Sequence, residues 1–454
     1  MKRLALIALL AAAGAAQTAT VIQNATVHTI TKGTFTGSVL VRDGRIADVA
    51  PQLLVPAGAS VVDGTGKHLI PGMIDSHVHY AADATNEGSI SVSSMVRIDD
   101  VINAEQVSIP RALAGGVTTA LIVHGSANPI GGLGSVVKMR PGQDAEGLKF
   151  KEAAPTIKMA LGENPKRQGE GGQSPFGGQQ ARRYPGTRMG VEDVIRTALT
   201  EARNYQAQWK AYQEARQRGA DPLPPRRDLK LEPLVELLEG KRLAHVHCYR
   251  ADEILMILRL SEEFGFKIPV LVHALEGYKV AKEVAAHGAG VSALSDWWSY
   301  KIEAYDAIPY NAALLAKNGV LVSLHSDDIQ AELTRRLNVE AAKAVKYGGV
   351  ADNDALAMIT INPAKQLKID QYVGSIESGK QADLALFDKH PLSTFAKVEK
   401  VWVDGRLYFD RDTEMTGRPE RITRKQTLIQ RERELEKRSG PAVPAAKRPG
   451  GGAE

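Results

Sequence analysis

Two histidines one residue apart end an apolar stretch near the start of the chain. His77 and His79 belong to the sequence GMIDSHVHY, residues 72–80. In a β-strand, side chains two positions apart lie on the same face, so the two imidazoles would project side by side into the same space. Neutral imidazole is the commonest protein ligand for zinc and its neighbours in the transition series. The pair therefore predicts a metal site, provided that other parts of the chain supply further ligands.

Further polar residues end or interrupt other apolar runs. They are Lys158 in PTIKMAL, His247 in LAHVH, His273 in PVLVH and Asp327 in VLVSLHSD. A buried polar group without a partner costs roughly 1–3 kcal/mol, so each such residue would be unfavourable by itself. Several of them at equivalent strand ends are better explained by one shared site.

The elements that position these residues alternate in type. Between about residues 71 and 363, the strand candidates are HLIPGMID, VTTALIV, APTIKMAL, LAHVHC, PVLVHAL, GVSAL and VLVSLHSD. Amphipathic stretches such as RADEILMILRLSEEFG lie between them, and most end at a glycine. This alternation predicts parallel βα units, and a length near the ~250 residues of a (β/α)8 TIM-like barrel favours that closed form. In such barrels the chemistry lies at the C-terminal strand ends.

Both ends of the chain carry a similar hairpin pattern. The segments VRDGRIADVA and VWVDGRLYFD alternate apolar and polar residues, with Asp43-Gly44 and Asp404-Gly405 as the turns. We therefore expect one small β-sandwich module built from both chain ends, with the barrel inserted into it. The expected parts are the module, residues 17–70 and 366–410, and the barrel domain, residues 71–365.

A secretory signal peptide is expected at residues 1–16. In MKRLALIALLAAAGAAQ, two basic residues precede an apolar run that ends in small residues, which is the pattern of a cleavable signal. The run is shorter than the about 20 residues of a membrane span, and no later segment qualifies. We therefore expect an exported protein, periplasmic or secreted, without a membrane span. Its single cysteine, Cys248, excludes an internal disulfide.

The positive charge is concentrated at the two ends of the chain. The formal net charge is +5, but the excess of Lys and Arg lies in the N-terminal stretch and from residue 411 onward. A basic face for nucleic acid is therefore not expected. Residues 411–454 are expected to form a charged, partly disordered tail, because a solvated helix is followed by SGPAVPAAKRPGGGAE.

An ordered set of motifs resembles the amidohydrolase superfamily, and closely its imidazolonepropionase-like and metallo-dipeptidase (prolidase-like) branch. The matching stretches are GMIDSHVH, GGVTTALIVHGSANPIGG, IKMALGENPKR, VHCYRADEILMILRLSEEFG, LVHALEGY, SLHSDD and GSIESGKQADLALFD. They run from about residue 72 to residue 388 in the expected order. With the N-terminal β-strands they cover most of the chain.

The resemblance implies two divalent metal ions, for which zinc is expected, and a lysine carbamate formed with carbon dioxide. The implied ligands are His77, His79 and Asp327 for one ion, His247 and His273 for the other, and Lys158 as the bridge. A metal-bridging hydroxide would attack a polarised carbonyl. Asp327 would be the catalytic acid that passes the proton to the leaving nitrogen.

The expected reaction is hydrolysis of a C–N bond in a small-molecule or short-peptide substrate: a dipeptide, an N-acyl amino acid or a cyclic amide. A substrate carboxylate would be bound by Tyr249 and Arg250, which directly follow a ligand histidine where the strand opens onto the catalytic face. Arginine gives planar bidentate contacts to carboxylates. Tyr249 is preferred, because its spacing of two from His247 keeps it on the same face.

Neighbouring residues of similar type leave alternatives open. They are His245 for His247, Asp328 for Asp327, and Lys138 or Glu163 for Lys158. His124 and His325 could approach the site or serve the structure. The histidines without a motif, expected to be ordinary surface or loop residues, are His28, His68, His287 and His390.

Two other functions are weighed against amide hydrolysis. Deaminases of this superfamily use one metal and a His-x-x-Glu after the fifth strand, but Arg250 occupies the glutamate position after His247. A His-x-x-Glu formed by His273 and Glu276 falls on the following strand. A mononuclear deaminase or imidazolone-type ring hydrolase is therefore the alternative, and a catalytically silent binding protein the third. For the insertion at about residues 162–231, two interpretations stay open: a lid or a subunit contact in a homo-oligomer, and a surface excursion without a catalytic part.

Overall fold

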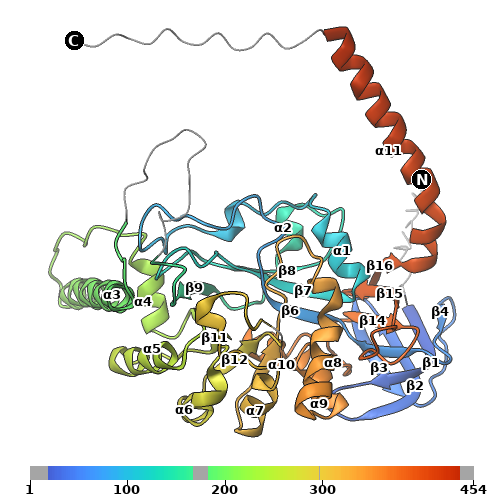
Figure 1. Cartoon of the computed structure of the whole chain (residues 1–454), viewed down its shortest axis with the longest axis horizontal. Helices are drawn as coiled ribbons and strands as arrows, with labels where there is room; N and C mark the ends of the chain where they lie inside the picture. Colours follow the sequence, from blue (N-terminus) through green and yellow to red (C-terminus); the bar gives the residue numbers. More distant parts are fainter. Residues whose placement is uncertain (1–18, 167–182, 296, 440–454) are drawn as a thin grey trace, which may run out of the picture. The chain divides into compact units, whose positions relative to one another are not determined.

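The computed structural model describes residues 19–166, 183–295 and 297–439 (Figure 1). The expected signal peptide and the Gly- and Gln-rich start of the insertion lie outside these ranges. The chain forms two compact units, residues 1–409 and residues 410–454. The described part of the second unit is the helix α11 (Arg411–Ser439), whose described side chains are mostly exposed.

Strands from both ends of the chain form one eight-stranded sheet, as the hairpin patterns predict (Figure 1). Its order is β16-β15-β14-β5-β1-β2-β3, and β4 also pairs with β1. The two predicted Asp-Gly turns have positive φ at both residues, which is the conformation of a tight hairpin turn. The strands are β1 (Ala19–His28), β2 (Thr34–Arg42), β3 (Arg45–Ala50), β4 (Ser60–Asp63), β5 (His68–Pro71), β14 (Leu384–Phe387), β15 (Val398–Val403) and β16 (Arg406–Asp410).

Parallel strands form the central part of the first unit. Strands β9 to β13 form a parallel sheet in the order β13-β12-β11-β10-β9, and β6 pairs parallel with β7. The α/β class predicted from the alternation is thus confirmed, although β8 pairs antiparallel with β7. The strands are β6 (Met73–Val78), β7 (Val117–Ile122), β8 (Ser135–Lys138), β9 (Thr156–Ala160), β10 (Leu243–Cys248), β11 (Val270–His273), β12 (Gly290–Ala293) and β13 (Val322–Leu324).

The predicted strand HLIPGMID is two strands, because the chain crosses from one sheet to the other at Gly72. The Gly72 amide donates to the Asp383 carbonyl directly before β14 of the first sheet, and the Met73 amide donates to the Gly116 carbonyl directly before β7. A Cβ at position 72 would lie 2.1 Å from the Thr118 hydroxyl, so only glycine fits this crossing. The crossing leads into β6, which pairs with β7 and carries His77, with His79 one residue past its end.

The helices between the strands follow the predicted amphipathic stretches. α5 buries its apolar face and ends at Gly265, whose φ of +69° is typical of a helix C-terminus. None of the helices in the described ranges is long and apolar enough to cross a bilayer. The helices are α1 (Ser108–Ala114), α2 (Ala145–Leu148), α3 (Arg188–Gln217), α4 (Glu232–Leu238), α5 (Ala251–Phe264), α6 (Ala281–His287), α7 (Asn311–Lys317), α8 (Leu337–Gly348), α9 (Asp352–Ala357) and α10 (Ile361–Gln366).

The described part of the insertion contains the helix α3, which packs against α4, directly after the insertion, and also contacts α5 (Figure 1). Val191, Ile195, Ala198 and Ala202 are buried at helical spacing in the first half of α3. Its second half is mostly exposed. The insertion is therefore an ordered helical layer in the part that the structure describes.

Candidate metal centre

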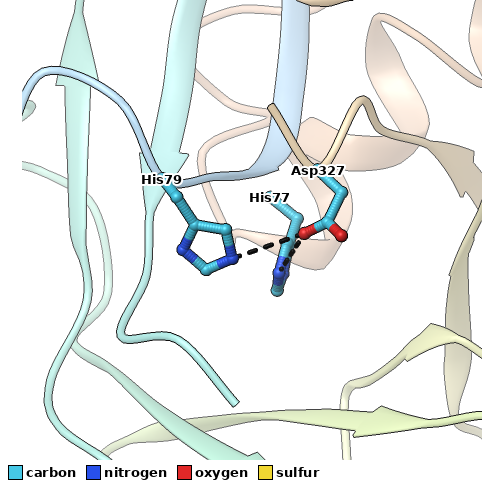
Figure 2. Close-up of side chains that lie close together, drawn as sticks. All are labelled: His77, His79 and Asp327. Atoms are coloured by element: carbon cyan, nitrogen blue, oxygen red, sulfur yellow. Dashed lines mark ion pairs between the residues drawn. The ribbon is translucent and has the colours of Figure 1, made fainter. Parts of the chain in front are cut away.

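Two histidines at the end of β6 face a carboxylate that follows β13 (Figure 2). The Nε2 atoms of His77 and His79 each lie 3.3 Å from Oδ1 of Asp327. One potential ligand atom from each residue lies within 4.8 Å of the others, which is a separation that one metal ion can span. This is the arrangement expected from the His-x-His pair.

Backbone contacts bring the two segments together. The Asp327 amide donates to the His77 carbonyl over 3.2 Å, and the His79 amide donates to the Asp328 carbonyl over 2.8 Å. Asp327 adopts a positive φ of 53°, a conformation that non-glycine residues adopt only at an energetic cost. The local structure therefore holds the carboxylate toward the histidines at the expense of backbone strain.

A buried aspartate that sequence reasoning missed fixes this turn. Asp75 is fully buried two residues before His77 and accepts hydrogen bonds from Ser326 and from the Thr334 hydroxyl. Burial raises the pKa of Asp75 to about 6, although these hydrogen bonds oppose the shift. Asp75 could have been identified from the sequence by its position two residues before His77, because residues two apart in a strand share a face.

The other predicted ligands lie beside this group. The Lys158 Nζ is 3.2 Å from the His77 Nε2. The ring centroid of His273 lies 5.3 Å from that of His77 and 4.6 Å from that of His247. All four of these side chains are buried. The structure thus brings the six predicted ligand residues into one cluster, and their roles as ligands stay predictions.

The alternative residues have different environments, and Glu163 pairs with Lys301 over 3.5 Å. Asp328 accepts from the backbone amides of Gln330, Leu333 and Thr334, so its carboxylate holds a loop. Lys138 is buried in an ion pair with Asp383, and is absent from the cluster. His245 is fully buried, and neither ring nitrogen has a hydrogen-bond partner.

The two remaining histidines near the cluster have hydrogen-bonded rings. The Nε2 of His124 accepts from the Glu87 amide over 2.8 Å, and its Nδ1 lies 2.8 Å from the Gly125 carbonyl oxygen. These bonds give His124 a structural role. The Nε2 of His325 lies 3.0 Å from the Nδ1 of His273, and its own Nδ1 lies 2.8 Å from the Ser292 hydroxyl. His325 therefore orients a predicted ligand.

Burial sets the protonation of the cluster. It lowers the pKa values of His77, His247 and His273 well below the usual value, so these rings are neutral near pH 7. Burial lowers the pKa of Lys158 to about 7, and the nearby Asp327 carboxylate opposes this shift to a smaller extent. Much of the Lys158 amine is therefore uncharged near pH 7. Burial also acts to raise the pKa of Asp327, but the adjacent imidazoles, His273 first, hold it well below its usual range.

This donor set fits divalent cations. Neutral imidazoles, a carboxylate and an uncharged amine offer lone pairs, and metal ligands must be deprotonated in this way. The Nδ1 atoms of His77 and His247 are buried without a hydrogen-bond partner. The cluster therefore contains more electron-pair donors than its own hydrogen bonds satisfy.

Comparison with known proteins agrees with this geometry. A model of the amidohydrolase family matches residues 245–408. The solved structure of an amidohydrolase from Thermotoga maritima is 38% identical, with an alignment that covers 86% of this chain and 100% of that one and a TM-score of 0.76. The chain belongs to the amidohydrolase family. The family resemblance inferred from the motifs is thereby confirmed, and this amidohydrolase is a hydrolase of carbon–nitrogen bonds.

Two curated relatives match most of this amidohydrolase. Amidohydrolase tasK of Hapsidospora irregularis is 30% identical over 423 residues, which are 87% of this chain and 42% of tasK. The chain thus spans less than half of the length of that relative. Imidazolonepropionase of Treponema denticola is 23% identical over 421 residues, which are 82% of this chain and 92% of that protein.

The predicted substrate contacts of the amidohydrolase differ in their surroundings. Tyr249 is buried with its ring centroid 4.6 Å from that of His247, and the Lys301 ammonium lies 4.4 Å from the Tyr249 ring centroid. The Arg250 guanidinium is partly exposed and makes two hydrogen bonds of 3.0 and 2.9 Å to Asp252. Tyr249 therefore borders the cluster, whereas the Arg250 side chain is engaged by a neighbouring acid.

The glutamate of the second His-x-x-Glu motif caps a helix. The Glu276 carboxylate accepts from the Ala251 amide over 3.0 Å at the start of α5, and it pairs with Lys279 over 3.3 Å. It is engaged by the protein itself, so it is poorly placed to shuttle protons to a substrate ring. This observation weighs against the deaminase alternative.

Proposed function

We propose that this amidohydrolase cleaves the C–N bond of a dipeptide, an N-acyl amino acid or a cyclic amide with two divalent ions. The observation that carries this proposal is the convergence of neutral imidazoles, a carboxylate and a lysine amine in one buried cluster. The family supports hydrolysis, and the engaged Glu276 speaks against deamination.

The residues divide between the two proposed ions. His77, His79 and Asp327 would hold one ion, His247 and His273 the other, and Lys158, as a carbamate formed with carbon dioxide, would bridge them. Bound zinc supplies Lewis acidity, which polarises a carbonyl and acidifies water. An uncharged Lys158 amine is required for carbamate formation, because an ammonium has no lone pair. The lowered pKa of Lys158 supports this step.

The chain itself supplies proton transfer and orientation. The Asp327 carboxylate accepts a proton and delivers it to the leaving nitrogen, because it is ionised and lies at the centre of the cluster. Tyr249 and Arg250 are proposed to receive a substrate carboxylate. Lys301 adds a positive charge over the Tyr249 ring.

We also infer how the sheets are arranged. The parallel strands are proposed to close into a (β/α)8 barrel, residues 71–365, and the sheet of the two chain ends to form the β-sandwich module. Two bridges support closure, because Val78 pairs with Asp328 and Ile130 with Met159. The insertion is proposed to shape the substrate entrance, because Arg188 on α3 pairs with Glu303 beside Lys301.

A substrate panel tests the function. Dipeptides, N-acyl amino acids and imidazolone-type cyclic amides are incubated with the zinc-loaded enzyme, and the released amine or the opened ring is measured. Hydrolysis of at least one of these classes is expected. Release of ammonia from amino-substituted rings, without hydrolysis of any amide, would support the deaminase instead.

The metal content is expected to be two zinc ions per chain in the cluster, because its six residues suffice for both sites. Protein prepared with zinc and bicarbonate is analysed by mass spectrometry for metal and for the lysine carbamate. The measurement compares wild type with Lys158→Met, which should retain less metal. If the cluster bound one zinc ion per chain, and added bicarbonate did not change this number, the binuclear site would be contradicted.

A tyrosine substitution tests carboxylate recognition. Tyr249→Phe is expected to lower kcat/KM by roughly 10- to 100-fold on a substrate with a free carboxylate, because each factor of ten equals about 1.4 kcal/mol of lost contact. Metal content should stay unchanged. Arg250→Ala is measured in parallel, because its guanidinium must leave Asp252 to reach a substrate. Full activity of both variants would place carboxylate recognition elsewhere.

We further propose that the protein is exported and that its signal peptide is removed after Ala15 or Ala16. The charged start, apolar run and small residues of the N-terminus support this proposal. N-terminal sequencing of protein from the cell envelope or medium of its source should show the shortened chain. Full-length protein confined to the cytoplasm would contradict export.

A further inference from the structure

Three histidines expected to be ordinary surface or loop residues meet in space, away from the metal cluster. The ring centroids of His28, His68 and His390 lie 5.3 to 5.4 Å from one another in all three pairs. We call them the histidine triad. The sequence expectation is wrong for His28, which is buried, and also for His287, which is buried against Ser261.

The register of the first sheet explains why the triad forms. His68 pairs with Thr26 on β1 and with Phe387 on β14. His28 is two residues after Thr26, so His28 and His68 lie on the same face of the sheet. His390 follows β14 by three residues, and the chain returns it to that face. Two neighbouring strands near the N-terminus and one segment more than three hundred residues later thus contribute one ring each.

An acidic residue borders the triad. Asp352, the first residue of α9, has its Oδ2 3.7 Å from the Nε2 of His390. The next residue, Asn353, donates to the Ile30 carbonyl over 3.0 Å, so the start of α9 is fixed beside the end of β1. Three imidazoles and one carboxylate from four segments therefore lie near one another, although their ligand atoms are not gathered within 4.8 Å as those of His77, His79 and Asp327 are.

We propose that the histidine triad and Asp352 bind a divalent transition metal, with zinc as the best match. Three histidines and a carboxylate form a four-ligand set of the types that tetrahedral zinc accepts. Closed sites of four protein ligands are structural, and this site lies among strands that join the two ends of the chain. The bound ion therefore stabilises the fold and takes no part in the hydrolysis.

The ligand atoms form two separate pairs, which must approach each other to hold one ion. With zinc–nitrogen bonds of about 2.0–2.1 Å, two ligands of a tetrahedral site lie about 3.3 Å apart. The Nε2 of His28 is 2.9 Å from the Nδ1 of His68, and the Nε2 of His390 is 3.7 Å from Asp352. Binding replaces the His28–His68 hydrogen bond and moves the second pair toward the first. The partial exposure of His390 and Asp352 permits this movement.

The charge state of the triad suits a cation. Burial, followed by the charges of the other two rings, lowers the pKa of His28 to about 4, and burial also lowers the pKa of His68. Both rings are therefore neutral near pH 7 and have a lone pair. The Nδ1 of His28 lies 3.2 Å from the Thr34 hydroxyl, which leaves its Nε2 to face His68.

Zinc stoichiometry tests the site. Protein without a histidine tag is saturated with zinc, desalted and analysed for zinc per chain, for wild type, His390→Ala, His68→Ala and His287→Ala. His390→Ala and His68→Ala are each expected to contain one zinc ion per chain less than wild type. The matched control His287→Ala is expected to lose none. Equal zinc content in wild type and both triad variants would overturn the proposal.

The expected difference does not depend on the catalytic ions. If the cluster holds fewer than two ions, the total falls in every protein, but the triad variants still contain one ion less than wild type. His79→Ala separates the sites further, because it should lower the cluster content and leave the triad ion bound.

Thermal unfolding distinguishes metal loss from misfolding. In excess chelator, His390→Ala is expected to melt close to wild type, because it removes a partly exposed loop side chain. Added zinc should raise the Tm of wild type more than that of His390→Ala. An equal zinc-induced rise in both proteins would contradict a stabilising ion at the triad. His68→Ala is measured in the same assay, so that the test remains valid if one of the two variants folds poorly.

Discussion

The substitution Asp327→Asn is expected to lower kcat/KM by about 10²- to 10⁴-fold on any hydrolysed substrate. This range is the usual contribution of a positioned general acid or base. The introduced amide would keep the shape of the side chain, but it could not accept and return a proton, and it would be a weaker metal ligand. The measurement is steady-state kinetics at saturating zinc, together with the zinc content of each protein.

The adjacent residue provides a matched control. Asp328 holds the loop by accepting three backbone amide hydrogen bonds, and it does not face the histidines. Asp328→Asn is therefore expected to affect stability more than the chemical step. If Asp328→Asn abolished activity at full stability while Asp327→Asn remained active, the assignment of the acid would be reversed.

The second large effect is expected on stability. Lys138 is fully buried, with its Nζ 3.1 Å from Asp383 and 2.7 Å from the Gln381 side-chain oxygen, and it also pairs with Asp404. Lys138→Met leaves the buried Asp383 carboxylate without its cation, whereas Asp404 keeps its ion pair with Arg140. Breaking a buried ion pair in this way costs about 3–5 kcal/mol. Chemical denaturation should therefore show a clearly lower free energy of unfolding.

A second buried lysine gives the contrasting control. Burial lowers the pKa of Lys158, which shows that the folded protein disfavours its charge. Lys158→Met is therefore expected to retain the stability of the metal-free protein, and to lose metal and activity instead. An equal loss of stability in both variants would show that the Lys138 pairs have no special stabilising role.

The sequence predicts which residues come together, because they stand at strand ends. His247 and His273 stand out as polar residues within apolar runs, and strand periodicity orients His77 with His79. The parallel βα order then brings these ends together. The prediction did not require knowledge of which strands pair, because the C-terminal ends of all strands in a parallel βα fold lie at the same face.

Contacts between distant segments could not be predicted in this way. Lys138 looked like an alternative to Lys158, because both lie in short apolar strands. Only the pairing of β8 with β7 and its contact with Asp383 separate the two lysines. His28 and His390 likewise carry no local signal, since their proximity depends on the register of strands from opposite chain ends.

β5 receives its second neighbour late in protein synthesis. It pairs with β1 as soon as both have left the ribosome, but β14, which pairs with its other edge, follows about 310 residues later. At roughly 5–20 residues per second, that delay is about 15–60 s. Unpaired N–H and C=O groups on a strand edge invite pairing with another chain. A nascent or truncated chain that ends before Leu384 should therefore depend on a chaperone to shield this edge.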